Sequence, residues 1–196
     1  MRGYPIKKSG SLFCLSHFPW IKDYPAAPKT EVTVSWTEDA LCFHFCSYEQ
    51  NLRAVQTEHN SPVCQDSCVE IFMQYAPETD LRYINIEINP NCAVYAALRY
   101  DRARSTMIPP EEIQRLDVRV QAHKDRWEVD CRIPADWIRQ WIPTYRHEAG
   151  AILRGNLYKC GDLTDHPHYG AFADIPLPSP DFHRPEYFTA FRLTEE

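Results

Sequence analysis

The sequence has few glycines and no long hydrophobic run. Its 196 residues include 6 glycines against 16 prolines, which favours firm turns over flexible linkers. No window approaches the roughly 20 apolar residues of a membrane-spanning helix, and the basic N-terminal stretch lacks the apolar segment of a signal peptide. We therefore expect one packed domain over residues 1–196, located in the cytoplasm and without a membrane partner.

Basic residues are outnumbered by acidic ones. The chain has 21 Lys and Arg against 27 Asp and Glu, for a net charge of −6. Proteins that bind the nucleic-acid backbone need a clustered basic surface. The one local concentration, Arg99–Arg104, is typical of a solvated strand end or loop. We predict no nucleic-acid partner.

The eight cysteines form no Cys-x-x-Cys pair, which excludes zinc ribbons and thioredoxin-like redox motifs. Several lie in apolar runs, as buried free thiols do. Cys160, Asp162, His166 and His168 are side chains that zinc accepts as ligands. Their spacing matches no compact metal motif, and residues 162–165 are typical of a turn. We predict no metal site and no cofactor there.

Short segments with the period of a β-strand follow an irregular leader, residues 1–30. Val32, Val34 and Trp36 share one face of the first segment, and residues 41–46 return as the second arm of a hairpin. The predicted strands are 31–36, 41–46, 67–74, 82–89, 93–100, 117–122, 127–133, 152–158 and 189–193, and the predicted helices are 110–116 and 134–141. This pattern predicts an all-β fold, an antiparallel β-sandwich with one or two short helices.

Three of these segments alternate between two kinds of face. In 83–89 the isoleucines occupy every second position, which places Asn85 and Glu87 on the opposite face. Segment 67–74 also alternates, and pairing it with 83–89 as a hairpin brings Glu70 to the same face. With the third segment, the predicted face carries Glu70, Asn85, Glu87, Arg154 and Asn156.

An array of carboxylates, amides and a guanidinium suits a hydroxyl-rich ligand, because these groups form paired hydrogen bonds with hydroxyls. Antiparallel sheets also keep one polar face in solvent without any ligand. Glu70 and Glu87 could in addition form the carboxylate pair of a glycosidase. Three interpretations therefore stay open: sugar binding without catalysis, a structural or interaction domain, and a glycoside hydrolase. We favour the first and predict no catalytic residue.

Five motifs occur in the same order as in the family-9-like carbohydrate-binding modules. They are PVCQDSCVE (62–70), YINIEIN (83–89), Trp127 followed by Arg132-Ile-Pro134, RGNLYKCGD (154–162) and PDFHRPEYF (180–188). The sequence resembles that family from roughly Val32 to Leu193. The resemblance implies an immunoglobulin-like sandwich, non-catalytic sugar binding and, in some members, structural calcium. It also implies sugar contacts for Glu70, Asn85 and Asn156.

The family pattern lines its sugar cleft with two tryptophans, and here both positions differ. Cys64 stands at the first, and the second falls in the segment 170–172, where Phe172 is the available aromatic residue. A lost stacking contact is worth about 1 kcal/mol. We predict a saccharide or sugar-like ligand, with a domain that has lost sugar binding as the alternative. The predicted ligand-binding residues are Glu70, Asn85, Glu87, Arg154, Asn156 and Phe172.

Overall fold

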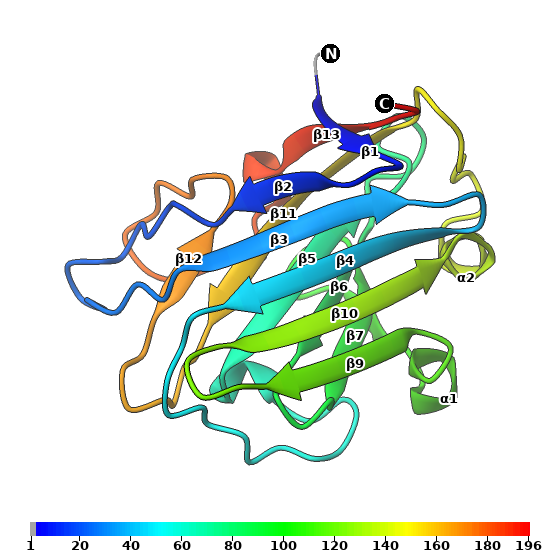
Figure 1. The fold of residues 1–196 in the computed structure, drawn as a ribbon. Helices are drawn as coiled ribbons and strands as arrows, with labels where there is room; N and C mark the ends of the chain where they lie inside the picture. The colour runs from blue at the N-terminus through cyan, green and yellow to red at the C-terminus, as the bar shows by residue number, and fades with distance from the viewer. Residues whose placement is uncertain (1–2) are drawn as a thin grey trace.

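The computed structural model describes residues 3–196, which form two β-sheets packed face to face (Figure 1). The smaller sheet has the strand order β2-β3-β4-β10-β9, and the larger has the order β1-β13-β11-β5-β6-β7-β8, with β12 paired to β11. The smaller sheet comprises β2 (Ser11–Cys14), β3 (Thr30–Trp36), β4 (Ala40–Ser47), β9 (Asp117–Ala122) and β10 (Trp127–Pro134). The larger comprises β1 (Tyr4–Lys7), β5 (Cys68–Gln74), β6 (Tyr83–Ile88), β7 (Val94–Arg99), β8 (Ser105–Met107), β11 (Ile152–Cys160), β12 (Tyr169–Ala171) and β13 (Thr189–Thr194).

The β-sandwich predicted from the alternation is confirmed. The isoleucines of β6 and the valines of β3 meet in the core between the sheets. Two short α-helices, α1 (Pro110–Ile113) and α2 (Ala135–Trp141), lie near one end of the smaller sheet (Figure 1), and two 3-10 turns are η1 (Val63–Gln65) and η2 (Pro185–Tyr187). Within residues 3–196, no helix has the length and hydrophobicity needed to cross a bilayer.

The N-terminal leader is not irregular throughout, as the sequence had suggested, because it contributes β1 and β2. Strand β1 pairs in parallel with β13, and it is the exception to an otherwise antiparallel arrangement of the described strands. Each strand has four residues, too few for a period-two pattern to be recognised. Strands β8 and β12, with three residues each, were missed for the same reason.

The polar faces of β5 and β6 are covered, not open to solvent. Both strands are buried along their whole length. Residues 15–28, 48–66 and 172–188, which we call the loop layer, pack a second hydrophobic cluster against this side of the larger sheet. Within it, Trp20 Nε1 donates a hydrogen bond of 2.7 Å to the carbonyl of Leu177. The predicted ligand face therefore lies in the interior, beneath loops.

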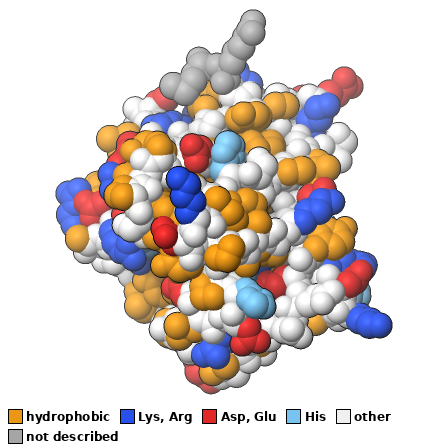
Figure 2. Space-filling model, turned by 90° about the vertical axis from the view of Figure 1, so that its left-hand side faces the viewer, with side chains coloured by type: hydrophobic (Ala, Val, Ile, Leu, Met, Phe, Trp, Pro, Cys, Tyr) orange, Lys and Arg blue, Asp and Glu red, His pale blue; other side chains and the backbone are white. Residues whose placement is uncertain are grey.

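Charged side chains of both signs are mixed with hydrophobic ones over the face shown in Figure 2. In the run Arg99–Arg104, Arg104 is exposed and pairs with Asp101, as expected of a solvated loop. Arg99 departs from that expectation, since it is buried and its Nε donates to Asn85 Oδ1 at 2.8 Å. The Arg99 guanidinium, at the end of β7, thus forms a hydrogen bond inside the protein instead of facing solvent.

At Gly155 in β11, the backbone of the neighbouring strand β5 lies so close that there is no room for a side chain. A Cβ atom there would collide with the carbonyl oxygen of Phe72 and lie 2.6 Å from Met73 Sδ. We expect Gly155→Ala to lower the free energy of unfolding by about 1–3 kcal/mol, the usual cost of overpacking a core. Urea denaturation measures this, and an unchanged midpoint would contradict it.

Candidate ligand-binding site

A cavity of about 150 Å³ lies between the larger sheet and the loop layer. Its floor is made by side chains of β5, β6 and β11 that point away from the core of the sandwich, because alternate residues of a strand face opposite sides. Its walls come from η1, from the segments that contain Arg102 and Asp162, from β12 and from residues 180–183. The lining residues are Cys64, Glu70, Phe72, Glu87, Arg102, Cys160, Asp162, Tyr169, Pro180, Asp181, Phe182 and His183.

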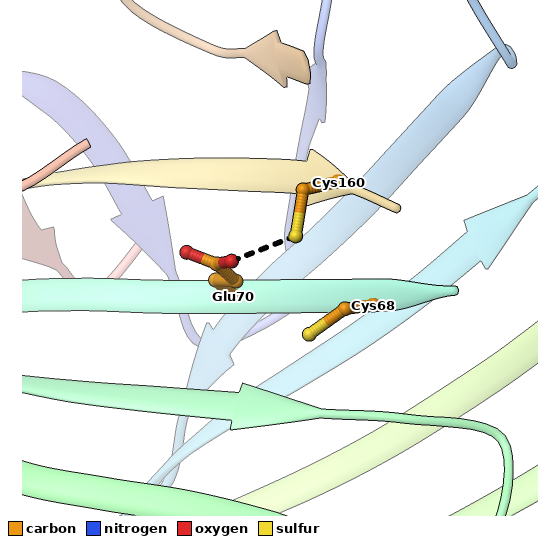
Figure 3. A group of neighbouring side chains, drawn as sticks. All are labelled: Cys68, Glu70 and Cys160. Carbon is orange, nitrogen blue, oxygen red and sulfur yellow. Dashed lines mark hydrogen bonds between the residues drawn. The ribbon is translucent and has the colours of Figure 1, made fainter. Parts of the chain in front are cut away.

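Two buried carboxylates face the cavity from adjacent strands. Glu70 and Glu87 are directly opposed in the antiparallel pair β5–β6. The Cys160 thiol donates a hydrogen bond of 2.9 Å to Glu70 Oε1 (Figure 3). Burial and the charge of Glu87 raise the pKa of Glu70 well above its ordinary value, and burial raises the pKa of Glu87 to about 7. Near pH 7 Glu87 is therefore partly protonated, so the pair can donate as well as accept hydrogen bonds.

A chain of hydrogen bonds holds the Glu87 carboxylate in place. Asn85 Nδ2 donates to Glu87 Oε1 at 2.8 Å, and Arg99 Nε donates to Asn85 Oδ1 at 2.8 Å. The second guanidinium branch donates to the Tyr95 hydroxyl at 2.8 Å. Asn85 is fully buried and does not line the cavity. In this arrangement its amide orients Glu87 from below.

The wall opposite the carboxylates is aromatic. Phe182 stacks on Tyr158 with ring centroids 4.0 Å apart and planes 5° apart, which fixes the phenyl ring. Tyr169 meets Phe182 edge to face at 6.1 Å. At the exposed edge, Arg102 Nη1 donates to Asp181 Oδ1 at 3.1 Å. The cavity therefore combines a polar floor, an apolar wall and a charged rim.

His183 contributes an uncharged ring to the same wall. Its Nδ1 lies 3.0 Å from the Tyr83 hydroxyl, and its ring packs against Phe72 at 4.9 Å. Burial, together with the charges of Arg99 and Arg102, lowers the pKa of His183 to about 3. The imidazole is therefore neutral at physiological pH and acts as part of the wall.

Four of the six residues predicted to contact a ligand, Asn85, Arg154, Asn156 and Phe172, lie outside the cavity lining. The Asn156 amide makes two hydrogen bonds with the backbone of Ala173. Its Nδ2 donates to the Ala173 carbonyl at 2.9 Å, and its Oδ1 accepts from the Ala173 N–H at 2.8 Å. Arg154 Nη2 donates to the Phe188 carbonyl at 2.9 Å. Both side chains tie the loop layer to β11.

Phe172, the predicted aromatic contact, packs elsewhere. Its ring meets Phe13 edge to face at 5.1 Å and Tyr4 at 5.0 Å, against the core of the sandwich. Backbone direction explains this position, because Phe172 follows Ala171, which faces the cluster under the loop layer. Tyr169 and Phe182 provide the aromatic surface of the cavity instead.

The four side chains considered as metal ligands in the sequence are not brought together. Cys160 and Asp162 line the cavity. His168 is buried in a separate cluster, and His166 is exposed. The turn after β11 separates the two pairs. The absence of a metal ion from the protein stays a prediction.

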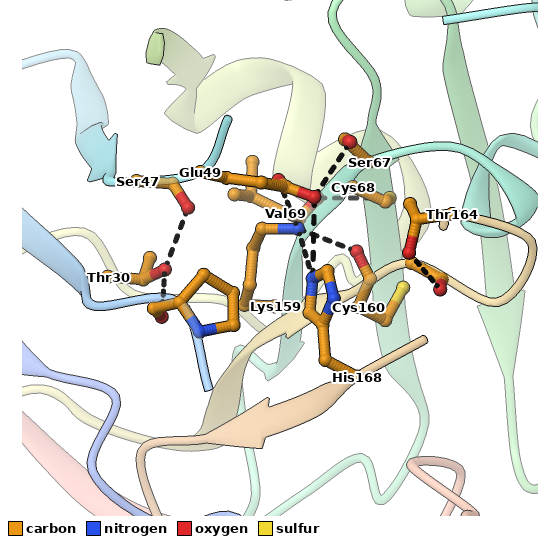
Figure 4. Close-up of polar contacts among 12 residues, drawn as sticks. Thr30, Ser47, Glu49, Ser67, Cys68, Val69, Lys159, Cys160, Thr164 and His168 are labelled. Atoms are coloured by element: carbon orange, nitrogen blue, oxygen red, sulfur yellow. Dashed lines mark hydrogen bonds and ion pairs between the residues drawn. The ribbon is translucent and has the colours of Figure 1, made fainter. Parts of the chain in front are cut away.

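His168 belongs to a buried ion-pair cluster (Figure 4). Lys159 Nζ lies 2.9 Å from Glu49 Oε2 and 2.8 Å from His168 Nε2. His168 Nδ1 is 2.8 Å from the carbonyl of His166, so Nδ1 carries the proton and Nε2 accepts from Lys159. Burial and the Lys159 charge lower the pKa of His168 to about 4. The cluster therefore consists of a neutral His168 beside the charged Lys159 and Glu49.

The resemblance implies structural calcium in some members of the family, and the described residues, 3–196, were compared with its ligand requirements. Among residues 3–196, one group of at least three His, Cys, Asp or Glu side chains has converging donor atoms: Cys68, Glu70 and Cys160. Calcium takes six to eight oxygen ligands, whereas two of these three donors are sulfur atoms. The group does not fit calcium.

Sequence reasoning missed the residues that wall the cavity: Arg102, Tyr169, Asp181 and Phe182. Asp181 and Phe182 lie in the motif 180–188. The sequence therefore identified this segment but did not predict its position in the fold. No local pattern shows that this segment folds back over β5 and β11. The signal available was the density of aromatic residues in an otherwise irregular stretch.

Comparison with known proteins supports this picture of the fold. A candidate carbohydrate-binding protein from Bacteroides uniformis superposes with a TM-score of 0.86 at 24% identity, covering 98% of this chain and 100% of that one. A family 9 carbohydrate-binding module from Caldicellulosiruptor kristjanssonii, solved with glucose, has a TM-score of 0.65 at 14% identity, covering 100% and 97%. A structure of a family 9 module from that organism with cellotriose has a TM-score of 0.60 at 15% identity, covering 87% and 77%.

No curated protein is similar enough in sequence to match. The sequence model of one family does match, and its description is carbohydrate-binding family 9. The match extends over residues 11–193, which include the smaller sheet, the larger sheet apart from β1 and the last residue of β13, and all the residues that line the cavity. With nearly the whole chain covered, this protein belongs to carbohydrate-binding family 9.

Proposed function

We propose that this chain binds a saccharide, without chemical change, in the cavity between the larger sheet and the loop layer. The observation that carries the proposal is the pairing of the Glu70 and Glu87 carboxyl groups with an aromatic wall that includes Phe182. Carboxyl groups form paired hydrogen bonds with sugar hydroxyls, and aromatic rings cover the apolar face of a pyranose. Membership of family 9 and the sugars bound by related modules support the same ligand class.

The cavity dimensions narrow the ligand to a small one. Its volume of about 150 Å³ is below the ~300–1,000 Å³ of typical small-molecule pockets. We infer that one sugar ring enters and that the remainder of a longer saccharide stays outside, near Arg102 and Asp181. The contacts proposed are Glu70 and Glu87, with Asn85, Arg154 and Asn156 holding the surrounding structure and Phe172 packing in the core.

A glycan array followed by calorimetry tests this proposal. We expect Glu70→Gln to weaken binding of the best glycan by about 10- to 100-fold, since a buried polar group left without its hydrogen-bond partner costs about 1–3 kcal/mol. Asp130→Asn is the control, because Asp130 pairs with His44 on the outer face of the smaller sheet. Absence of binding to every glycan would refute the proposal and favour a structural or interaction domain of the same fold.

The proposal includes the absence of catalysis. Glycoside hydrolases also use a pair of opposed carboxyl groups for catalysis. We therefore expect no release of product when the glycans that bind are incubated with the protein and followed by chromatography. Product formation that disappears in Glu70→Gln would contradict this part and establish a hydrolase.

A cytoplasmic location forms a further part of the proposal. All eight cysteines are free thiols, which is the usual state in a reducing compartment. Cell fractionation of a tagged full-length protein would test it, and recovery outside the cytoplasm would refute it.

A further inference from the structure

Three side chains at the floor of the cavity or beneath it bring metal-ligating donor atoms close together. Cys68 Sγ, Cys160 Sγ and a carboxylate oxygen of Glu70 all lie within 4.8 Å of one another (Figure 3). Cys68 and Cys160 are directly paired across β5 and β11, and Glu70 is the next residue on the same face of β5. The geometry is set by two paired strands in the interior of a sheet, so it does not depend on a mobile loop.

The chemistry of these donors selects the ion. Two thiolates and one carboxylate match Zn²⁺, which binds sulfur at about 2.3 Å and carboxylate oxygen at about 2.0–2.2 Å in a tetrahedron. Such distances require donor atoms about 3.5–3.8 Å apart. The separations here, between the 2.9 Å of Cys160 Sγ to Glu70 Oε1 and the 4.8 Å limit, bracket that requirement. Small side-chain rotations are enough to close the site.

The surroundings favour a cation and give it access. Glu87 and Asp162 place two further carboxyl groups at the same cavity, and Cys64 adds a third thiol to its lining. Glu70 and Cys160 line the cavity, so an ion that enters it meets two of its three ligands at once.

We propose that Cys68, Cys160 and Glu70 bind a thiophilic divalent cation at the floor of the cavity. The donor atoms identify this cation as zinc. Each sulfur binds as a thiolate and Glu70 binds as a carboxylate, and every ligand that is protonated beforehand releases its proton to solvent. The fourth coordination position faces the cavity, where water or the Cys64 thiolate can occupy it. This site is independent of the proposed sugar binding in one respect, since Cys68 lies beneath the cavity and does not line it.

Titration of the reduced, full-length protein with Co²⁺, followed by displacement with Zn²⁺, tests the site. We expect an intense thiolate-to-cobalt absorption band and one zinc per chain by elemental analysis. Cys68→Ser and Cys160→Ser should each weaken zinc binding by more than about 100-fold, beyond the 10- to 100-fold effect of outer-shell residues. Cys42→Ser is the control, a partly buried thiol on the smaller sheet.

The outcomes separate this inference from the proposed function. Cys68→Ser should lose zinc and keep glycan binding, whereas Glu70→Gln should lose both. A wild-type protein that shows no thiolate-to-cobalt band would overturn the site, and this measurement needs no variant to fold. Zinc binding that is unchanged in both serine variants would also overturn it, because the metal would then be held elsewhere.

Discussion

Replacing Lys159 by methionine is expected to lower the free energy of unfolding by about 3–5 kcal/mol, the cost of leaving a buried charge without its partner. Lys159 is completely buried, and its ammonium group is fully used: Nζ contacts Glu49 Oε2 at 2.9 Å, the Cys160 carbonyl at 2.7 Å and His168 Nε2 at 2.8 Å. Burial raises the pKa of Glu49, but the charge of Lys159, the influence of His168 and the hydrogen bonds from Lys159 and Ser67 together outweigh it, and the pKa is lowered. Without Lys159, the Glu49 carboxylate stays in the interior with its counter-charge removed.

Chemical denaturation at pH 7 measures the effect, and two variants define it. Lys29→Met removes an exposed lysine that pairs with Glu31, so it should leave the free energy of unfolding nearly unchanged. Combining Lys159→Met with Glu49→Gln should recover part of the loss, because the second change removes the unpaired charge. A loss below about 1 kcal/mol in Lys159→Met, or a double variant less stable than additivity predicts, would contradict this account.

Glu87→Gln is expected to make the protein more stable above pH 7, by roughly 3 kcal/mol at pH 8. The folded-state pKa of Glu87 is about 7 against an ordinary value of 4.5, and each pH unit of difference corresponds to about 1.36 kcal/mol. Burial favours the protonated acid, so the folded state holds a proton that the unfolded state has released. Stability from this group is therefore lost as the pH rises from 4.5 to 7, and it stays constant above.

The measurement is the difference in unfolding free energy between Glu87→Gln and the wild type from pH 4 to pH 9. His168 makes the difference necessary, because its lowered pKa of about 4 gives the opposite slope between pH 4 and 6.5 in both proteins. Glu128→Gln is the control, since Arg126 lowers the pKa of Glu128. A Glu87→Gln difference that does not grow with pH would refute the predicted pKa.

The placement of Glu70 and Glu87 was predictable from the sequence because it depends on local alternation. The isoleucines of β6 had to face the core, and pairing β5 with β6 as a hairpin put both glutamates on the other side. The same alternation placed Asn85 on that face. What alternation does not specify is whether a polar face meets solvent, a ligand or another layer of the protein.

The sequence by itself determined the β-sandwich, most of its strands and the face to which the candidate site belongs, because period-two patterns are local and act through burial. The tertiary structure decided that loops cover this face, that Phe172 turns into the core while Phe182 and Tyr169 wall the cavity, and that Cys68 and Cys160 pair across strands. These features depend on contacts between distant segments, such as that of Trp20 with Leu177. Packing between these segments stabilises the features, and a local sequence pattern does not indicate which distant segments will pack together.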